Sequence, residues 1–169
     1  MSSAAVVPSE RERARAKILR WFRALLVVLG VFPWVLPILR AKLPMGEVGV
    51  GLDMAFLTMC HRRIPRTLIF DGVPMPLCSR CAGIFLGIAI GAAIGRPILE
   101  LRTWRWAFVG AGALMVADVV TQDLGIHPVW HVTRVATGLL VGYGMVIGFL
   151  SALARDKRRD AEPAPQAAE

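Results

Sequence analysis

The sequence predicts an all-α membrane protein with four transmembrane helices and a short interfacial or re-entrant helix before a Cys/His loop. Of its 169 residues, 56% are hydrophobic, and the mean hydropathy of +0.57 is too high for an ordinary soluble domain. Four apolar stretches have the length that crosses a hydrocarbon core of about 30 Å. The net charge of +8 comes mainly from arginines beside these stretches.

The chain begins with a basic cytoplasmic segment, residues 1–21. Arginines alternate with apolar residues over 10–23, which predicts a basic helix at the lipid headgroups, although a solvated charge run would also explain residues 10–16. The first span is predicted over about 22–39. A secretory signal peptide has a similar start, but the long apolar run and the lack of a small-x-small cleavage site favour a retained helix.

The longest connection, residues 40–81, is the predicted Cys/His loop. Within it, Val50 to Met59 is apolar but too short to span a membrane. We expect this segment to form an interfacial or re-entrant helix that ends at Cys60. Asp53 lies near its start, where the helix dipole favours an acidic residue.

Three further spans are predicted over about 82–99, 104–121 and 133–153, so that residues 22–153 form the transmembrane domain. A charged, Pro/Ala-rich tail, residues 154–169, is expected to be disordered. Glycines recur every four residues in the second span, which places them on one helix face and predicts close helix packing or oligomer contacts in lipid. These glycines are Gly83, Gly87, Gly91 and Gly95.

All three cysteines lie between residues 60 and 81, and they predict a metal site. Cys60 is followed at once by His61, and Cys78 and Cys81 form a Cys-x-x-Cys turn. Three thiolates and one imidazole suit zinc, and all four ligands together would make a closed, structural site. If His61 points away, the fourth position is open to water.

Polar residues also interrupt the ends of the last two predicted spans. Asp118 and Gln122 lie one turn apart, and Arg134 opens the last span. With four spans, these side chains emerge on the same membrane face as the cysteines. An aspartate inside a span requires a partner, and we expect Arg134 to pair with Asp118, with Arg80 as the alternative. Asp118, Gln122 and Arg134 are the candidate catalytic group, although the sequence assigns no reaction.

Thirteen of the twenty Lys and Arg residues lie at the two termini and in the 96–105 turn. The positive-inside rule then predicts a multi-pass protein of the bacterial inner (plasma) membrane with both termini in the cytoplasm. Its expected partners are membrane lipids, including anionic headgroups, because no basic surface interleaved with aromatic residues indicates nucleic acid binding.

The combined motifs resemble the DUF2085 family of uncharacterised multi-pass prokaryotic membrane proteins over residues 53–148. The resemblance rests on the Cys60-His61 pair with Arg66, on the stretch from Pro76 to Gly83, and on two later motifs. The later motifs are Asp118-Val-Val-Thr-Gln122 and Arg134-Val-Ala-Thr137-Gly138. His127 and His131 fall outside the shared pattern. The resemblance implies a multi-pass membrane protein and no established activity.

Two other functions remain open at this stage. Cys78 and Cys81 could form a thiol-disulfide redox pair, because the N-terminus of a helix lowers a thiol pKa. The Asp118, Gln122 and Arg134 cluster could instead bind or transport a lipid headgroup or small anion. His127 and His131 are interpreted as loop residues without a ligand role.

Overall fold

The computed structural model describes residues 10–61, 63–96 and 101–161. The elements follow one another as α1 (Glu10–Lys42), α2 (Gly46–Leu57), the single 3-10 turn η1 (Ile64–Arg66), β1 (Thr67–Phe70), β2 (Val73–Cys78), α3 (Ser79–Ile94), α4 (Leu101–Asp123) and α5 (His131–Ala161). The described chain is therefore helical except for one antiparallel β-hairpin.

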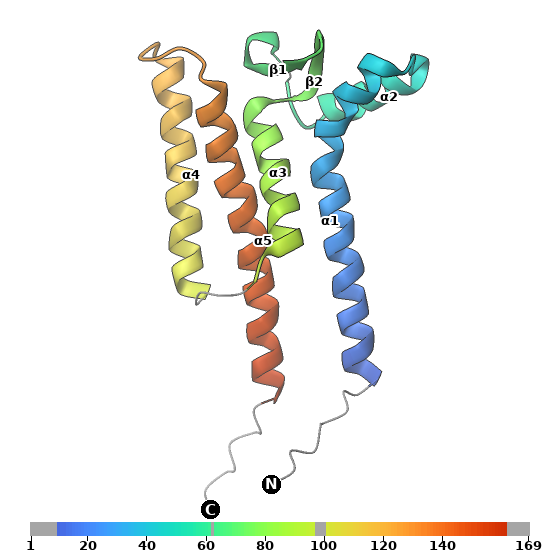
Figure 1. The fold of residues 1–169 in the computed structure, drawn as a ribbon. Helices are drawn as coiled ribbons and strands as arrows, with labels where there is room; N and C mark the ends of the chain where they lie inside the picture. The colour runs from blue at the N-terminus through green and yellow to red at the C-terminus, as the bar shows by residue number, and fades with distance from the viewer. Residues whose placement is uncertain (1–9, 62, 97–100, 162–169) are drawn as a thin grey trace, which may run out of the picture.

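Four helices run side by side, with α3 between α1 and α5 and with α4 against the other side of α5 (Figure 1). The hairpin and α2 cover one end of this bundle. At the opposite end of the bundle lie the first residues of α1 and the last residues of α5 (Figure 1). This arrangement brings the ends of α2 and β2 and the start of α3 to one side of the molecule.

The prediction of four transmembrane spans is wrong. Among the described helices, only α1 and α5 are long and apolar enough to cross a membrane. α3 has 16 residues, fewer than the 20 or so that a span needs. α4 has 23 residues, but Arg102, Arg105 and Asp118 interrupt its apolar sequence. Their apolar composition made these two segments resemble spans.

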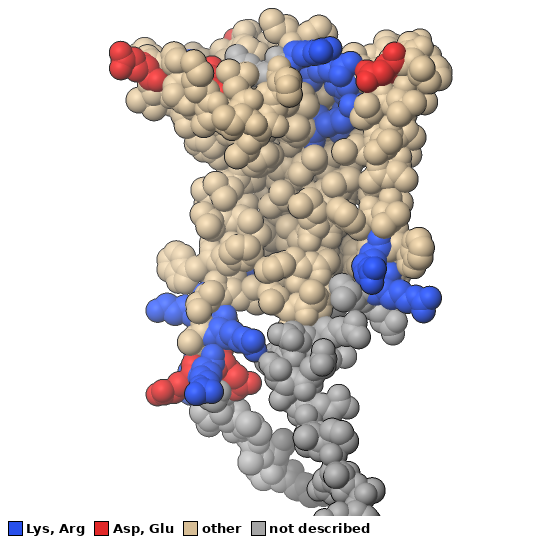
Figure 2. Space-filling model, turned by 180° about the vertical axis from the view of Figure 1, so that it is seen from behind, with Lys and Arg blue, Asp and Glu red and all other residues tan. Residues whose placement is uncertain are grey.

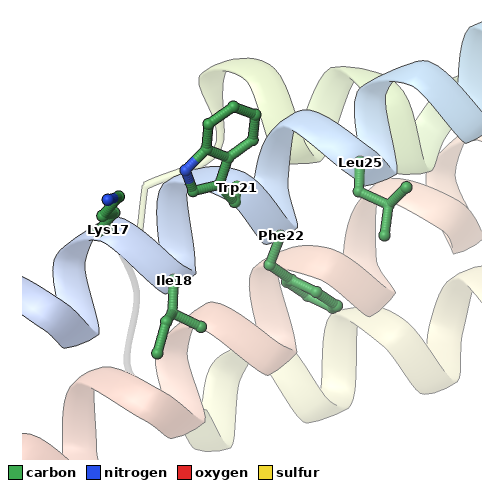
Figure 3. A pocket seen from close by; sticks show the side chains of 5 residues that line it. All are labelled: Lys17, Ile18, Trp21, Phe22 and Leu25. Carbon is green, nitrogen blue, oxygen red and sulfur yellow. The ribbon is translucent and has the colours of Figure 1, made fainter.

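Side-chain exposure along α1 differs from that of a soluble core helix. Only 22% of its most apolar stretch is buried by the rest of the protein. Lys and Arg gather at the two ends of the molecule, and the band between them lacks charged side chains on the face in Figure 2. On α1, Lys17 and the exposed Trp21 help to line a shallow groove near one end (Figure 3). Such a distribution is typical of a protein in contact with lipid.

The glycines of α3 and α5 let the two backbones touch, which confirms that the glycine stripe is a packing device. A Cβ atom added to Gly83 or Gly87 would overlap a carbonyl oxygen of α5. In the reverse direction, a Cβ atom at Gly138 or Gly142 would overlap a carbonyl oxygen of α3. Close backbone contact replaces the hydrophobic effect as the source of helix association in lipid.

α1 holds α3 through two hydrogen-bonding side chains. Trp34 donates its indole N–H to the carbonyl of Ala82 at 3.0 Å. Arg23 donates to the carbonyls of Ala92 at 2.6 Å, Ala93 at 3.2 Å and Gly95 at 3.1 Å. The last turn of α3 has no basic residue of its own, so Arg23 caps the negative end of its dipole.

The predicted loop 40–81 contains more structure than expected. The short helix lies over Gly46–Leu57 and ends just before Cys60. Asp71 and Gly72 form a two-residue turn with φ values of 49° and 79°, which suits a tight hairpin. At the other end of the chain, α5 continues through Ala161 into the predicted disordered tail; residues 1–9 and 162–169 lie outside the described residues.

The packing of α3 on α5 predicts opposite results for two glycines of α5. Gly142→Ala should force the helices apart and lower the free energy of unfolding by about 1–3 kcal/mol. Gly148→Ala is the matched control, because no atom outside the helix backbone lies within 4 Å of its added Cβ atom. Melting temperatures in detergent should fall for Gly142→Ala alone; an equal fall for both would contradict the close contact.

Candidate metal centre

The three cysteines converge at the hairpin end of the bundle. The sulfur atoms of Cys60, Cys78 and Cys81 all lie within 4.8 Å of one another. Cys60 is buried and the other two are half-buried, and none of the three forms a disulfide. No other group of three His, Cys, Asp or Glu side chains in the described residues has metal-binding spacing.

Local structure fixes each thiol separately. Cys60 follows α2, and its backbone N–H donates to the carbonyl of Phe56 at 3.0 Å. Cys78 pairs with Thr67 in the hairpin and occupies the residue position just before α3, which puts Cys81 in the first helical turn. The backbone N–H of Cys78 points at the sulfur of Cys60, 3.4 Å away. Such N–H donors commonly support metal-bound thiolates.

Apolar packing holds these elements against each other. Cys60 belongs to a buried cluster with Leu36 of α1, Phe56 of α2 and Leu77 of β2. Cys78 and Cys81 pack against the same cluster. The site is therefore enclosed on one side by side chains from four different elements.

The pKa values of Cys78 and Cys81 shift in opposite directions. A hydrogen bond from the Cys81 side chain lowers the pKa of Cys78 to about 5, and Cys60 and two backbone N–H groups add to this effect against the opposing effect of burial. The same hydrogen bond with Cys78 raises the pKa of Cys81, and burial acts in the same direction. The lowered pKa of Cys78 favours its thiolate, the ionised form that binds metals.

The donor set fits a soft or borderline metal ion. Three sulfurs on a tetrahedral Zn²⁺ stand about 3.8 Å apart, given a Zn–S distance of about 2.3 Å. The observed separations, at most 4.8 Å, require only small adjustments of side-chain rotamers. His61 is exposed and does not belong to this group, so the structure brings together three of the four predicted ligands.

Beside the cysteines, the polar residues of α3, α4 and α5 form a different pairing from the one expected. Arg80, between Cys78 and Cys81, donates from Nε and Nη2 to one carboxylate oxygen of Asp118, with Nε at 3.0 Å. Both side chains are nearly buried, with 11% and 8% exposed. Asp118 is therefore paired with Arg80 and not with Arg134.

Gln122 connects this pair to Arg134. Its side-chain oxygen accepts a hydrogen bond from Nη2 of Arg134 and a longer one, 3.4 Å, from Nη2 of Arg80. Arg134 itself is only 2% exposed. The three predicted residues thus do share one cluster, and Arg80 is the additional member that joins it to the cysteine site.

Two ion pairs at this end were not predicted from the sequence. Arg40 at the end of α1 pairs with Asp53 of α2 at 2.9 Å, and Arg66 pairs with Asp123 at 2.8 Å. The Arg66 pair is partly exposed, with 31% and 55% of the side chains accessible. Both pairs join residues of opposite charge from different elements, a relationship that spacing along the chain does not reveal.

The two histidines of the α4–α5 connection have different surroundings. His127 lies 2.9 Å from the hydroxyl of Thr121 and stacks on Trp130 with ring centroids 4.9 Å apart. His131 begins α5, and its Nδ1 atom is buried without a hydrogen-bond partner. Neither histidine belongs to the cysteine group.

Because the Arg80–Asp118 pair is buried, we expect the stability of the fold to depend strongly on both side chains. Asp118→Ala should lower the free energy of unfolding by about 3–5 kcal/mol, because it leaves buried guanidinium groups without a carboxylate. Asp118→Asn combined with Arg80→Gln should recover much of this loss. Asp123→Asn, which breaks the exposed pair, is the control and should cost about 1 kcal/mol or less. Melting in detergent would test this; equal losses for Asp118→Ala and Asp123→Asn would contradict burial of the pair.

The described geometry coincides with the part of the chain that is shared with other proteins. An uncharacterised protein of Methanocaldococcus jannaschii is 27% identical over 107 residues, which cover 61% of this chain and 69% of that protein. An uncharacterised protein of Methanothermobacter thermautotrophicus is 33% identical over 97 residues, covering 56% of this chain and 86% of that protein. No solved structure matches significantly. The family described as "Predicted membrane protein (DUF2085)" matches residues 60–148, from the first cysteine to the middle of α5, and the chain belongs to this family of predicted membrane proteins.

Proposed function

We propose that the protein is an inner (plasma) membrane zinc protein. Its zinc is held by Cys60, Cys78 and Cys81 at the extracytoplasmic end, and the fourth coordination position is open. The observation that carries this proposal is the convergence of three sulfur atoms from separate elements, within 4.8 Å of one another. The adjacent cluster of Arg80, Asp118, Gln122 and Arg134 is the polar surrounding in which a ligand on this position would lie.

Zinc is favoured by the type of donor. Thiolates select Zn²⁺, Cu⁺ and iron–sulfur clusters, whereas oxygen donors select Mg²⁺ and Ca²⁺. A single tetrahedral ion needs one centre about 2.3 Å from each sulfur, which the compact triangle of sulfurs allows. A bound Zn²⁺ with three protein ligands retains one position for water and can polarise a ligand placed there.

A thiol-disulfide redox role requires only two cysteines. The lowered pKa of Cys78 at the start of α3 would also suit such a role. However, a redox pair does not explain why Cys60 arrives from α2 and accepts a hydrogen bond from the backbone of Cys78. A three-sulfur metal site explains all three positions together.

The membrane topology rests on the two helices that can span. α1 and α5 run in opposite directions, so a chain that spans with both has its basic ends on one side (Figure 1). Thirteen of the twenty Lys and Arg residues belong to that side. At the opposite end, Arg40, Arg66 and Arg80 are paired with aspartates, which reduces their weight in the positive-inside rule. Both termini are then cytoplasmic.

The metal proposal predicts about one zinc ion per purified chain. Cys78→Ser and Cys60→Ser should each lose most of this zinc, because two thiolates bind far more weakly than three. His61→Ala is the matched control and should retain it, since His61 lies outside the cysteine group. Elemental analysis of protein purified without added metal would measure the content.

Two results would decide against this form of the site. Loss of zinc in His61→Ala would mean a closed, structural Cys3His site with no open position. Metal-free wild-type protein whose cysteines react with an alkylating reagent only after reduction would instead favour a Cys78–Cys81 redox pair.

The topology predicts that a reporter placed after α1 and a reporter at the C-terminus lie in different compartments. A reporter fused after Met45, beyond the end of α1, should be extracytoplasmic, and a reporter at the C-terminus should be cytoplasmic. Paired fusions to alkaline phosphatase and to a fluorescent protein would measure this. Both reporters on the same side would contradict the two-span arrangement.

A further inference from the structure

The guanidinium of Arg134 is the most completely buried charged group at the cysteine end of the molecule. Arg134 is only 2% exposed, and its Nη2 atom donates to the neutral side-chain oxygen of Gln122. Its Nε atom is buried and has no hydrogen-bond partner. Arginine does not lose its proton in proteins, so this side chain carries a full positive charge in a site shielded from water.

The neighbouring carboxylates are already paired with other arginines. Asp118 binds Arg80, and Asp123 binds Arg66. No ion pair joins Arg134 to a carboxylate within the residues that the structure describes. A buried charge without an ionic partner is strongly unfavourable, which indicates that a negative group completes the cluster.

Arg80 and Arg134 are also held close to each other. Nη2 atoms of both side chains contact the same oxygen of Gln122. Two guanidinium groups on one neutral oxygen repel each other, and Asp118 forms an ion pair with only one of them. Asp118 and the ionised Cys78 thiol also act on Arg134 through space, so what Arg134 lacks, among the described residues, is an anion in direct contact.

A second buried nitrogen without a hydrogen-bond partner belongs to His131, one helical turn before Arg134 on α5. Nδ1 of His131 is buried without a partner, and His131 and Arg134 are three residues apart on α5 and face the same way. Together with Arg80 from α3, Arg134 offers guanidinium nitrogens from two helices at one side-chain oxygen. A planar carboxylate pairs best with a single guanidinium, whereas a tetrahedral oxyanion accepts donors from several directions.

We propose that Arg134, Arg80, Gln122 and His131 form a binding site for a phosphate group that supplies the direct anionic partner Arg134 lacks. The group is either inorganic phosphate or the phosphodiester of a lipid headgroup. This site rests on the arginine cluster alone and does not require the proposed zinc, although Arg80 places it next to Cys78 and Cys81.

The test compares melting temperatures of the purified protein in detergent. Inorganic phosphate should raise the melting temperature of the wild type by about 3 °C or more over chloride at equal ionic strength. Phosphatidylglycerol, added in the same detergent without free phosphate, is the second arm. Stabilisation by both indicates a site open to free phosphate, and stabilisation by the lipid alone identifies a headgroup site.

Two variants connect this effect to the cluster. Arg134→Gln should remove the response, whereas Arg63→Gln, which changes an exposed arginine at the same end, should keep it. Gln122→Glu places a carboxylate between Arg80 and Arg134 in a side chain of nearly equal size. It should raise the melting temperature in phosphate-free buffer and abolish the response, which keeps the test informative if Arg134→Gln does not fold.

The proposal is overturned if neither phosphate nor phosphatidylglycerol stabilises the wild type, or if Gln122→Glu and Arg134→Gln respond like the wild type. Zinc content, measured on the same samples, separates this result from the metal proposal. None of these variants changes a cysteine, so each should contain as much zinc as the wild type. A response that persists in Cys78→Ser protein without zinc would support the site independently.

Discussion

The direct backbone contact between α3 and α5 is the constraint on which the rest of the structure depends. At four of the glycines no side chain separates the two helices, so the carbonyl of Arg80 lies against Gly138 and that of Val135 lies against Gly83. This register sets the start of α3 beside the first turns of α5. It thereby brings the Cys-x-x-Cys turn, Arg80 and Arg134 to the same end of the bundle. A larger separation would leave Arg80 and Arg134 too far apart to share Gln122.

Much of the site could be predicted from the sequence because its residues are chemically unusual. Cysteines at metal-ligand spacing and charged residues in apolar surroundings are both rare outside functional sites. The partner of Asp118 could not be predicted, because the choice between Arg80 and Arg134 depends on how α3 and α4 face each other. His61 follows Cys60 directly in the chain, but the direction of its side chain depends on the turn between α2 and η1, which spacing does not specify.

The fold was less predictable for a different reason. Apolar character alone does not decide whether a helix spans a membrane. α3 is largely covered by its neighbours but has only 16 residues, whereas α4 is long and exposed but contains Arg102, Arg105 and Asp118. The hairpin, by contrast, did have a local signal. Asp71-Gly72 between two short β-prone segments is a common two-residue turn, and the residues after it lead directly to Cys78. The prediction of a Cys/His loop over residues 40–81 overlooked this signal.

The cap that Arg23 forms on α3 has a consequence for biogenesis. A chain made from its N-terminus produces α1 first, so the guanidinium that caps Ala92, Ala93 and Gly95 exists before α3 does. The glycine surface of α5, which α3 also needs, is synthesised last. α3 can thus dock on α1 early but reaches its final packing only when α5 is inserted. Maturation of the cysteine end is therefore coupled to completion of the polypeptide, and truncated chains that lack α5 would not assemble it.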